Sequence, residues 1–127
     1  MAAKWGVRDR SSTIINYMVE HIEALDRAFS ALGDATRRAI LRRLTEGSAT
    51  VTELADPFEM SLNAVSKHIR VLERAGLLKR EVRGREHWCS LNPFPLKQVT
   101  DWAEPYRVFW EQRLDALEEF LRQDDGP

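Results

Sequence analysis

Residues 50–77 read TVTELADPFEMSLNAVSKHIRVLERAGL, and this stretch decides the fold. Thr50 and Glu53 have the spacing of a capping box, in which a hydroxyl and a carboxylate each bind a free backbone N–H. A short helix is therefore expected over residues 51–55. Pro57 ends that helix, because the residue before a proline avoids the helical conformation. A tight turn then leads to the next helix.

The second helix of this stretch has two unlike faces. Ser61 can cap its start, and Gly76 stops it after about Ala75. At helical spacing, its apolar side carries Val65, Ile69 and Leu72. Its outward side is basic and hydrogen-bonding, with Asn63, Ser66, Lys67, Arg70 and Arg74. The pair of helices predicts a helix-turn-helix, whose second helix fits a major groove about 12 Å wide, although a solvated charged face is the commoner meaning of an isolated helix of this kind.

The residues after this helix predict a basic β-hairpin. Residues 77–82 and 87–91 have the composition of strands, and Gly84 marks the turn between them. Arg83 and Arg85 lie at the tip. The first strand adds the charges of Lys79 and Arg80. A solvated tip is the plain alternative, but a basic hairpin directly after a basic helix favours a winged helix that binds nucleic acid at phosphates or in a minor groove.

The flanking segments predict further helices. Apolar residues recur every three or four positions over residues 12–32, as one helix or two pieces, and again over residues 93–123. Pro105 starts or kinks a turn in the second of these segments. Asp34 can cap another helix, which ends at Gly47. The inner face of that helix is expected to carry Ile40, Leu41 and Leu44.

The two long helices carry more apolar surface than a small winged domain can cover. An uncovered stripe of that length implies a partner surface. We therefore expect these helices to form a dimer interface, which also places two recognition helices about 34 Å, one DNA turn, apart. The residues expected at this interface are Ile15, Met18, Ile22, Tyr106, Trp110, Leu114 and Leu117.

Length and composition bound the class of protein. The chain has 127 residues, of which 43% are apolar and 31% charged, and this suits one domain with one core. The fold class is mainly α (α+β), a winged helix-turn-helix with a β-hairpin wing. We expect residues 1–32 to be the N-terminal dimerisation region, residues 33–92 the DNA-binding core and residues 93–123 the C-terminal dimerisation helix.

Charge is distributed unevenly along the chain. Residues 36–87 carry a net charge of +4 and residues 88–127 one of −4, although the whole chain carries −1. An anionic partner is therefore expected at the central region. No apolar run approaches the roughly 20 residues that span a bilayer, and residues 1–20 lack the apolar core of a signal peptide. We expect a cytoplasmic protein without a membrane partner.

Several motifs of the chain occur together in one known family. They are ALGDATRRAIL at residues 31–41, TELA at residues 52–55 and VSKHIRVL at residues 65–72, followed by AGL at residues 75–77. Together they resemble the ArsR-type winged-helix repressors of prokaryotes, closely over residues 24–91. The aromatic terminal helix resembles one branch of that family. The resemblance implies a homodimer that binds a palindromic operator, usually near its own promoter, and blocks transcription.

The same resemblance implies which residues meet DNA. Those at the recognition helix are Ser61, Asn63, Ser66, Lys67 and Arg70, and those at the wing are Arg83 and Arg85. The helical pattern itself adds Arg74 to the same face. Asn63 stands where the family often has a proline, and an amide at this position can pair with adenine.

Metal sensing, for which the family is best known, is not expected here. A thiolate sensor needs paired cysteines near the first helix of the motif, but residues 53–58 read ELADPF and Cys89 is the single cysteine. Residues 88–127 contain no histidine for a site on the terminal helix. His68 is expected to pack or to contact a phosphate, and Cys89 to lie in the hairpin core, with a redox switch as the lesser alternative. We expect no metal, cofactor or catalytic residue, and the sequence identifies no effector.

The sequence therefore predicts a sequence-specific DNA-binding transcriptional regulator rather than an enzyme, acting as a dimeric repressor of its own operator. Its expected partners are double-stranded DNA and a second copy of the chain. The alternative from another class is a winged-helix protein-interaction module without specific DNA binding, in which the basic face meets an acidic protein. A third hypothesis keeps the DNA binding and adds a small-molecule or metal inducer in the dimer interface.

Overall fold

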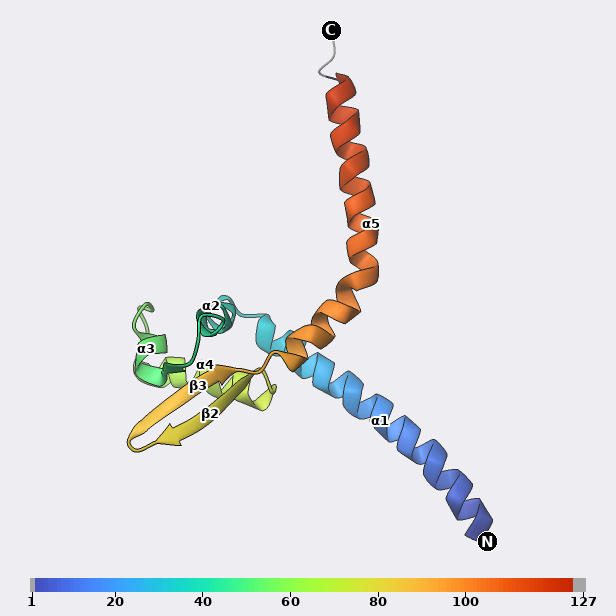
Figure 1. Ribbon diagram of the computed structural model, residues 1–127, viewed down its shortest axis with the longest axis horizontal. Coiled ribbons are helices and arrows are strands. Elements are labelled where there is room, and N and C mark those ends of the chain that lie inside the picture. The colour runs from blue at the N-terminus through green and yellow to red at the C-terminus, as the bar shows by residue number, and fades with distance from the viewer. Residues whose placement is uncertain (1, 125–127) are drawn as a thin grey trace.

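The computed structural model describes residues 2–124, with side chains from Ser12 onward. Its elements follow in the order α1 (Ala2–Leu32), α2 (Ala35–Leu44), β1 (Ala49–Thr50), α3 (Val51–Ala55), α4 (Leu62–Arg74), β2 (Leu78–Arg83), β3 (Glu86–Leu91) and α5 (Phe94–Asp124). The elements from α2 to β3 form a small core, and α1 and α5 meet beside it and extend in different directions (Figure 1). The mainly helical fold, with a hairpin wing and a helix at each end, confirms the predicted fold class.

The predicted capping residues do begin their helices. The side chains of Asp34, Thr50 and Ser61 each accept a hydrogen bond of 3.1 Å from the backbone N–H three residues further on. The predicted starts of α2, α3 and α4 are therefore confirmed. The Glu53 carboxylate lies 3.8 Å from Nη2 of Arg43 rather than closing the capping box.

The hairpin belongs to a three-stranded antiparallel sheet with the order β1-β3-β2. In the β1–β3 pair, Ala49 lies opposite Cys89 and Thr50 opposite Trp88. β1 could not be predicted from the sequence, because a two-residue strand shows no alternation and forms its hydrogen bonds with a segment far along the chain. At the hairpin tip, Gly84 has a φ of 64°, a left-handed conformation that glycine adopts without strain.

The core forms where α2, α3, α4 and the sheet meet. Its largest fully buried side chains are Ile40, Leu54, Val65, Ile69, Leu72, Leu77 and Cys89. The apolar faces predicted for α2 and α4 are thereby confirmed. Among the described side chains of α1, the buried ones are Ala28 and Ala31 at its C-terminal end, where small residues let the helix approach the core.

The two long helices cross beside the core. Phe29 of α1 packs edge-on against Trp102 of α5, with ring centroids 5.0 Å apart. Nε2 of Gln98 lies 3.3 Å from Nδ1 of His21. Beyond this crossing, Figure 1 shows each helix running alone, away from the core. Their apolar stripes are therefore exposed in a single copy of the chain.

Of the two long helices, α1 differs from the expectation and α5 agrees with it. α1 is one helix that begins at Ala2, so the prediction of a start at residue 12 was wrong. Residues 2–11 have no apolar stripe to reveal them, although alanine, lysine and arginine favour helices. α5 continues through Pro105 and bends along its course (Figure 1), as proline requires when it removes a backbone donor. No helix in the described part of the chain is long and apolar enough to cross a membrane.

Candidate nucleic-acid interface

The outer face of α4 presents polar and basic side chains to solvent. Its exposed members are Asn63, Lys67, Arg70 and Arg74, and Ser66 is half-buried among them. Ser61 is exposed at the N-cap, where its Oγ accepts the backbone N–H of Ala64. The hydroxyl hydrogen of Ser61 is thereby left for another acceptor, such as a phosphate oxygen. All six side chains lie where the sequence predicted them on the helix.

The wing holds its two predicted arginines differently. Nη2 of Arg83 donates to Oε2 of Glu81 at 3.1 Å, and the guanidinium lies 5.2 Å from the centre of the Trp88 ring. Arg85 is exposed in the turn beside Gly84. Arg83 is therefore held against the wing by a carboxylate and an aromatic ring, whereas Arg85 is the cation that extends the reach of the wing tip.

Arg80 does not lie with the tip. In the β2–β3 pair it is opposite Cys89, which is fully buried, so its side chain lies on the face of the sheet that packs against the helices. Its Nε lies 3.7 Å from Oε2 of Glu73 on α4. Lys79, the preceding residue, is exposed. Arg80 and Lys79 therefore do not lie together on one exposed face, as the predicted basic loop assumed, because successive side chains of a strand point to opposite faces.

An open hollow of about 650 Å³ lies between the hairpin and the helix-turn-helix, with residues 50–53 of β1 and α3 on its wall as well as α4, and we call it the wing hollow. Basic and polar side chains of α4 and the hairpin line it, namely Ser66, Arg70, Arg80, Arg85 and His87. Two carboxylates, Glu53 and Glu86, also lie on its wall. The structure thus brings Ser66, Arg70 and Arg85 together, while the other predicted DNA residues lie outside the hollow. Nothing in the sequence pattern indicated that His87 lines this hollow.

Arg37 ties the recognition helix to the end of α1. Its Nε donates to the carbonyl of Ala31 at 2.6 Å and its Nη2 to that of Ser30 at 3.2 Å, while Nη1 lies 3.3 Å from Nδ1 of His68 on α4. Asp34 lies 3.8 Å from the same ring nitrogen. The backbone N–H of Arg37, aided by His68, holds the pKa of Asp34 below its usual value. His68 is therefore a packed residue, and nothing in the sequence pattern indicated the role of Arg37.

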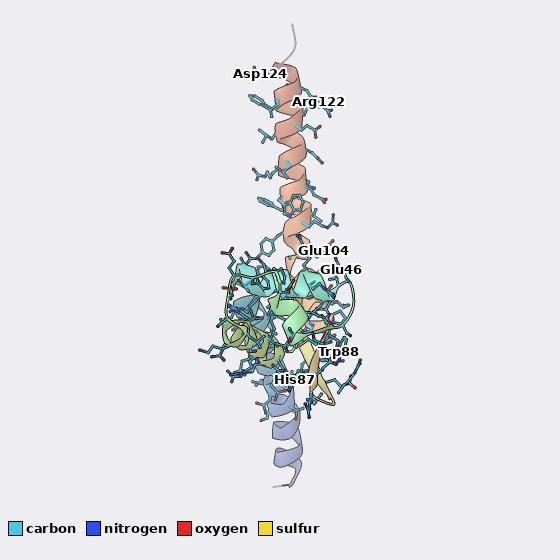
Figure 2. All side chains as sticks on the ribbon, turned by 90° about the vertical axis from the view of Figure 1, so that its left-hand side faces the viewer. Glu46, His87, Trp88, Glu104, Arg122 and Asp124 are labelled. Atoms are coloured by element: carbon cyan, nitrogen blue, oxygen red, sulfur yellow. The ribbon has the colours of Figure 1, made fainter. Side chains whose placement is uncertain are left out.

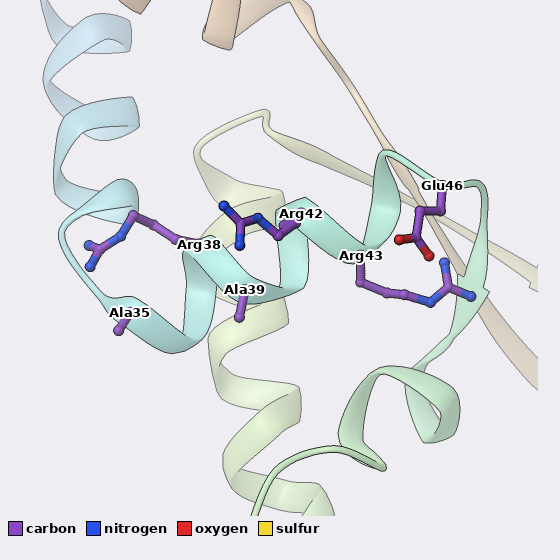
Figure 3. Close-up of a pocket in the computed structure, with 6 residues that line it drawn as sticks. All are labelled: Ala35, Arg38, Ala39, Arg42, Arg43 and Glu46. Carbon is purple, nitrogen blue, oxygen red and sulfur yellow. The ribbon is translucent and has the colours of Figure 1, made fainter.

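A second basic surface lies on α2, away from the wing. It is a hollow of about 520 Å³ whose lining residues are Ala35, Arg38, Ala39, Arg42, Arg43 and Glu46 (Figure 3). Since α2 buries its inner face against α4, its outer face points away from the outer face of α4. Figure 2 likewise shows Glu46 and His87 at opposite ends of the core. This surface is therefore distinct from the one that α4 and the wing form.

Cys89 has the environment of a structural cysteine. It is fully buried, as predicted for the hairpin core. Burial raises the pKa of its thiol, which outweighs the opposite influence of the nearby Arg80 and keeps the sulfur in its unreactive form. Among the residues that the structure describes, no group of three His, Cys, Asp or Glu side chains could hold a metal ion.

Both the sequence and the fold have known relatives. Residues 32–81 match the helix-turn-helix domain family. The chain is 44% identical over 97 residues to the HTH-type transcriptional regulator Rv2034 of Mycobacterium tuberculosis, which covers 76% of this chain and 87% of that protein. The crystal structure of the ArsR family transcriptional regulator RHA00566 superposes with a TM-score of 0.64 and 42% identity, covering 69% of this chain and 97% of that one. The chain belongs to the ArsR family of transcriptional regulators.

The fold agrees with that membership. The solution structure of the homodimeric winged helix-turn-helix DNA-binding domain Mb0332 of Mycobacterium bovis superposes with a TM-score of 0.57 at 20% identity, covering 78% of this chain and 89% of that one. In this ArsR-family protein, α3 and α4 are accordingly the helix-turn-helix, and the β2–β3 hairpin is the wing. The resemblance read from the sequence motifs is confirmed, and so is the prediction of a DNA-binding regulator.

Proposed function

We propose that this ArsR-family protein is a dimeric, sequence-specific repressor that binds a palindromic operator near its own gene, in the cytoplasm and without enzymatic activity. One observation carries the proposal. The basic outer face of α4 and the exposed Arg85 of the wing border the same hollow, so both can engage one duplex at the same time. The residues proposed to contact DNA are Ser61, Asn63, Ser66, Lys67, Arg70, Arg74, Arg83 and Arg85.

The two parts of this surface have different tasks in the proposal. Asn63 and Ser66 belong to the first turns of α4, the part of a recognition helix that meets base edges in the major groove. An asparagine there can bind adenine through two hydrogen bonds. The exposed Arg85 reaches phosphates or the minor groove, and it strengthens binding to every sequence alike.

The dimer in this proposal is built from the arms α1 and α5. Each of the seven residues assigned to the interface by the sequence exposes 48% or more of its surface in the single chain. So much exposed apolar area along two helices is unusual for a monomer and typical of a surface that a partner covers. The related domain Mb0332 is homodimeric, which supports a second copy as that partner. Two copies then place two α4 helices in successive major grooves, where they exclude other proteins from the promoter.

Two alanine substitutions should separate base reading from phosphate binding. Asn63→Ala is expected to cost about 1–3 kcal/mol on the operator and much less on random DNA, because a base contact is lost. Arg85→Ala is expected to weaken both duplexes equally and to lower the slope of log affinity against log salt by about 0.9, because one phosphate contact is lost. The measurement is a salt titration of fluorescence anisotropy on labelled operator and random duplexes.

Arg42→Ala is the matched control for Arg85→Ala, since it removes an equal charge from the far side of the core. It should leave both affinities and the slope near their original values. An Arg85→Ala protein with an unchanged slope would remove the wing from the mechanism. If the unmodified protein binds upstream DNA and random DNA with the same low affinity, the alternative of a protein-interaction module would be favoured instead.

Soft and borderline metals should not release the repressor. Zinc, nickel, cadmium or arsenite at stoichiometric concentration is expected to leave operator affinity unchanged, because such sites need about four ligands of matching softness and Cys89 is buried. Metal analysis of the purified protein, combined with anisotropy in the presence of each metal, checks this. One bound metal per chain together with loss of DNA affinity would contradict the prediction.

A further inference from the structure

Arg80 is a charged residue in an unusual position. Its side chain lies on the packed face of the sheet, where it is only 22% exposed. Among the described residues, the side-chain nitrogen and oxygen atoms that are buried without a hydrogen-bond partner all belong to Arg80. They are its Nε and Nη2. The Glu73 carboxylate, 3.7 Å from Nε, is beyond hydrogen-bond distance. Buried polar groups are normally paired, so this guanidinium needs an explanation.

The surroundings of Arg80 suggest an anion. It lines the wing hollow together with Arg70 of α4 and Arg85 of the wing tip, and Ser66 supplies a hydroxyl there. When the nearby Arg43 and Glu73 are counted with the lining residues, four arginines meet three carboxylates, Glu53, Glu73 and Glu86, so a positive charge remains. The wing hollow is therefore a net positive site that is open to solvent and borders both DNA-contacting elements.

The geometry of a duplex identifies which anion reaches the wing hollow. A major groove and its neighbouring minor groove are separated by one sugar-phosphate strand. If α4 enters the major groove and the wing tip enters the minor groove, that strand must pass between them. The wing hollow lies between the wing and the helix-turn-helix and has α4 on its wall, so backbone phosphates of a duplex bound in this way would come to its mouth whatever the base sequence.

We infer that Arg80 binds a backbone phosphate of this intervening strand, and that Glu73 holds the guanidinium loosely until DNA arrives. This inference rests on the proposed DNA binding and adds a phosphate contact from inside the wing. A phosphate oxygen can accept charge-assisted hydrogen bonds from a guanidinium, which the distant Glu73 carboxylate does not. Nε and Nη2 are buried in the free protein, so the guanidinium must turn toward the hollow to bind the phosphate, and no hydrogen bond of these two atoms has to break for it to do so.

Opposite effects on stability and binding follow from this role. Arg80→Met keeps the length of the side chain but removes the charge, so it should leave the melting temperature unchanged or raise it. The same variant should bind a random-sequence duplex about tenfold or more weakly, because a charge-assisted contact is lost. Its salt slope should fall by about 0.9. Arg80→Lys retains a point charge for the phosphate and should keep most of the slope.

Glu73 provides an independent test through the same arginine. Glu73→Gln should strengthen binding up to about fivefold, because it removes the competing carboxylate. Loss of a negative charge near DNA could strengthen binding without Arg80, so the double variant decides the cause. In the Arg80→Met background, Glu73→Gln should have little effect, and the two substitutions should be non-additive.

The experiment uses the full chain, a labelled random-sequence duplex and anisotropy over a range of salt, with melting temperatures measured in parallel. Arg42→Met is the control, since it makes the same substitution on the face of α2 that points away from DNA. The inference is supported if Arg80→Met loses affinity and slope while Arg42→Met does not. It is overturned if Arg80→Met binds like the unmodified protein, or if it mainly lowers the melting temperature, which would make Arg80 a structural partner of Glu73. An unmodified protein that binds no duplex overturns the proposed function itself.

Discussion

Replacing Trp110 by alanine is expected to dissociate the dimer and to weaken operator binding in parallel. Trp110 is 48% exposed in the single chain and belongs to the aromatic stripe of α5. Truncating a buried aromatic side chain costs about 3–5 kcal/mol, so the loss should be large if the partner covers this ring. Sedimentation velocity across a range of protein concentrations measures the assembly, and anisotropy on the operator measures the binding.

The loss of dimerisation and the loss of operator affinity are expected to occur together. A dimer holds its second α4 beside the second half-site, which makes the second binding event intramolecular and raises the overall affinity. A monomer loses this gain even though its own α4 and wing are intact. Gln112→Ala, an exposed polar position of the same helix, should change neither assembly nor binding. A monomeric Trp110→Ala protein with undiminished operator affinity would contradict the assignment of α5 to the dimer.

The parts of the fold that could be read from the sequence are those with a local cause. The start of α4 follows from one side chain, Ser61, that satisfies a backbone N–H three residues away. The burial of Ile69 and Leu72 follows from the helical period, because one face of an amphipathic helix must turn to the core. These features need no knowledge of what the helix packs against.

The parts that could not be read depend on segments distant in sequence. β1 has two residues, and its place is set by pairing with β3. Arg80 belongs to a basic run in the sequence, but the register of β2 with β3 puts it opposite the buried Cys89. The wing hollow exists because the hairpin folds back beside α4. In a short strand, the pairing with the adjacent strand decides whether a charged residue faces water or the core. The residues next to it in the sequence do not decide this.

The apolar stripes on the two long helices could be predicted from the sequence only in part. Each stripe was expected to form one surface for a partner. In the structure, Phe29 and Trp102 from the two stripes pack against each other within the chain, and Trp102 also lies against Tyr106. The inner part of each stripe therefore joins α1 to α5, and the outer part stays exposed in the single chain and is the part proposed for the dimer. Helical spacing reveals an apolar face but does not say which of two partners covers each portion.

Arg37→Ala is expected to be among the most destabilising substitutions outside the apolar core, and to weaken DNA binding without touching DNA. Arg37 donates to the carbonyls of Ala31 and Ser30 and contacts His68, so one side chain joins α1, α2 and α4. Hydrogen bonds from a charged group contribute about 1.5–3 kcal/mol, and the substitution removes the side-chain donor to the carbonyls of Ala31 and Ser30 at the end of α1. Since these groups are partly exposed, we expect a total cost of about 2–3 kcal/mol rather than the sum over the bonds.

Urea unfolding at a fixed protein concentration measures this cost, because the stability of a dimer depends on concentration. Arg38→Ala is the matched control. The neighbouring Arg38 is exposed and makes one hydrogen bond, to the carbonyl of Leu32 at 2.8 Å, so its removal should cost less than about 1 kcal/mol. Arg37→Lys should recover little, because an ammonium lacks the planar arrangement of donors that reaches several acceptors at once. Equal costs for Arg37→Ala and Arg38→Ala would show that the contacts of Arg37 do not hold α1 to the recognition helix, and operator affinity would then depend on α4 and the wing alone.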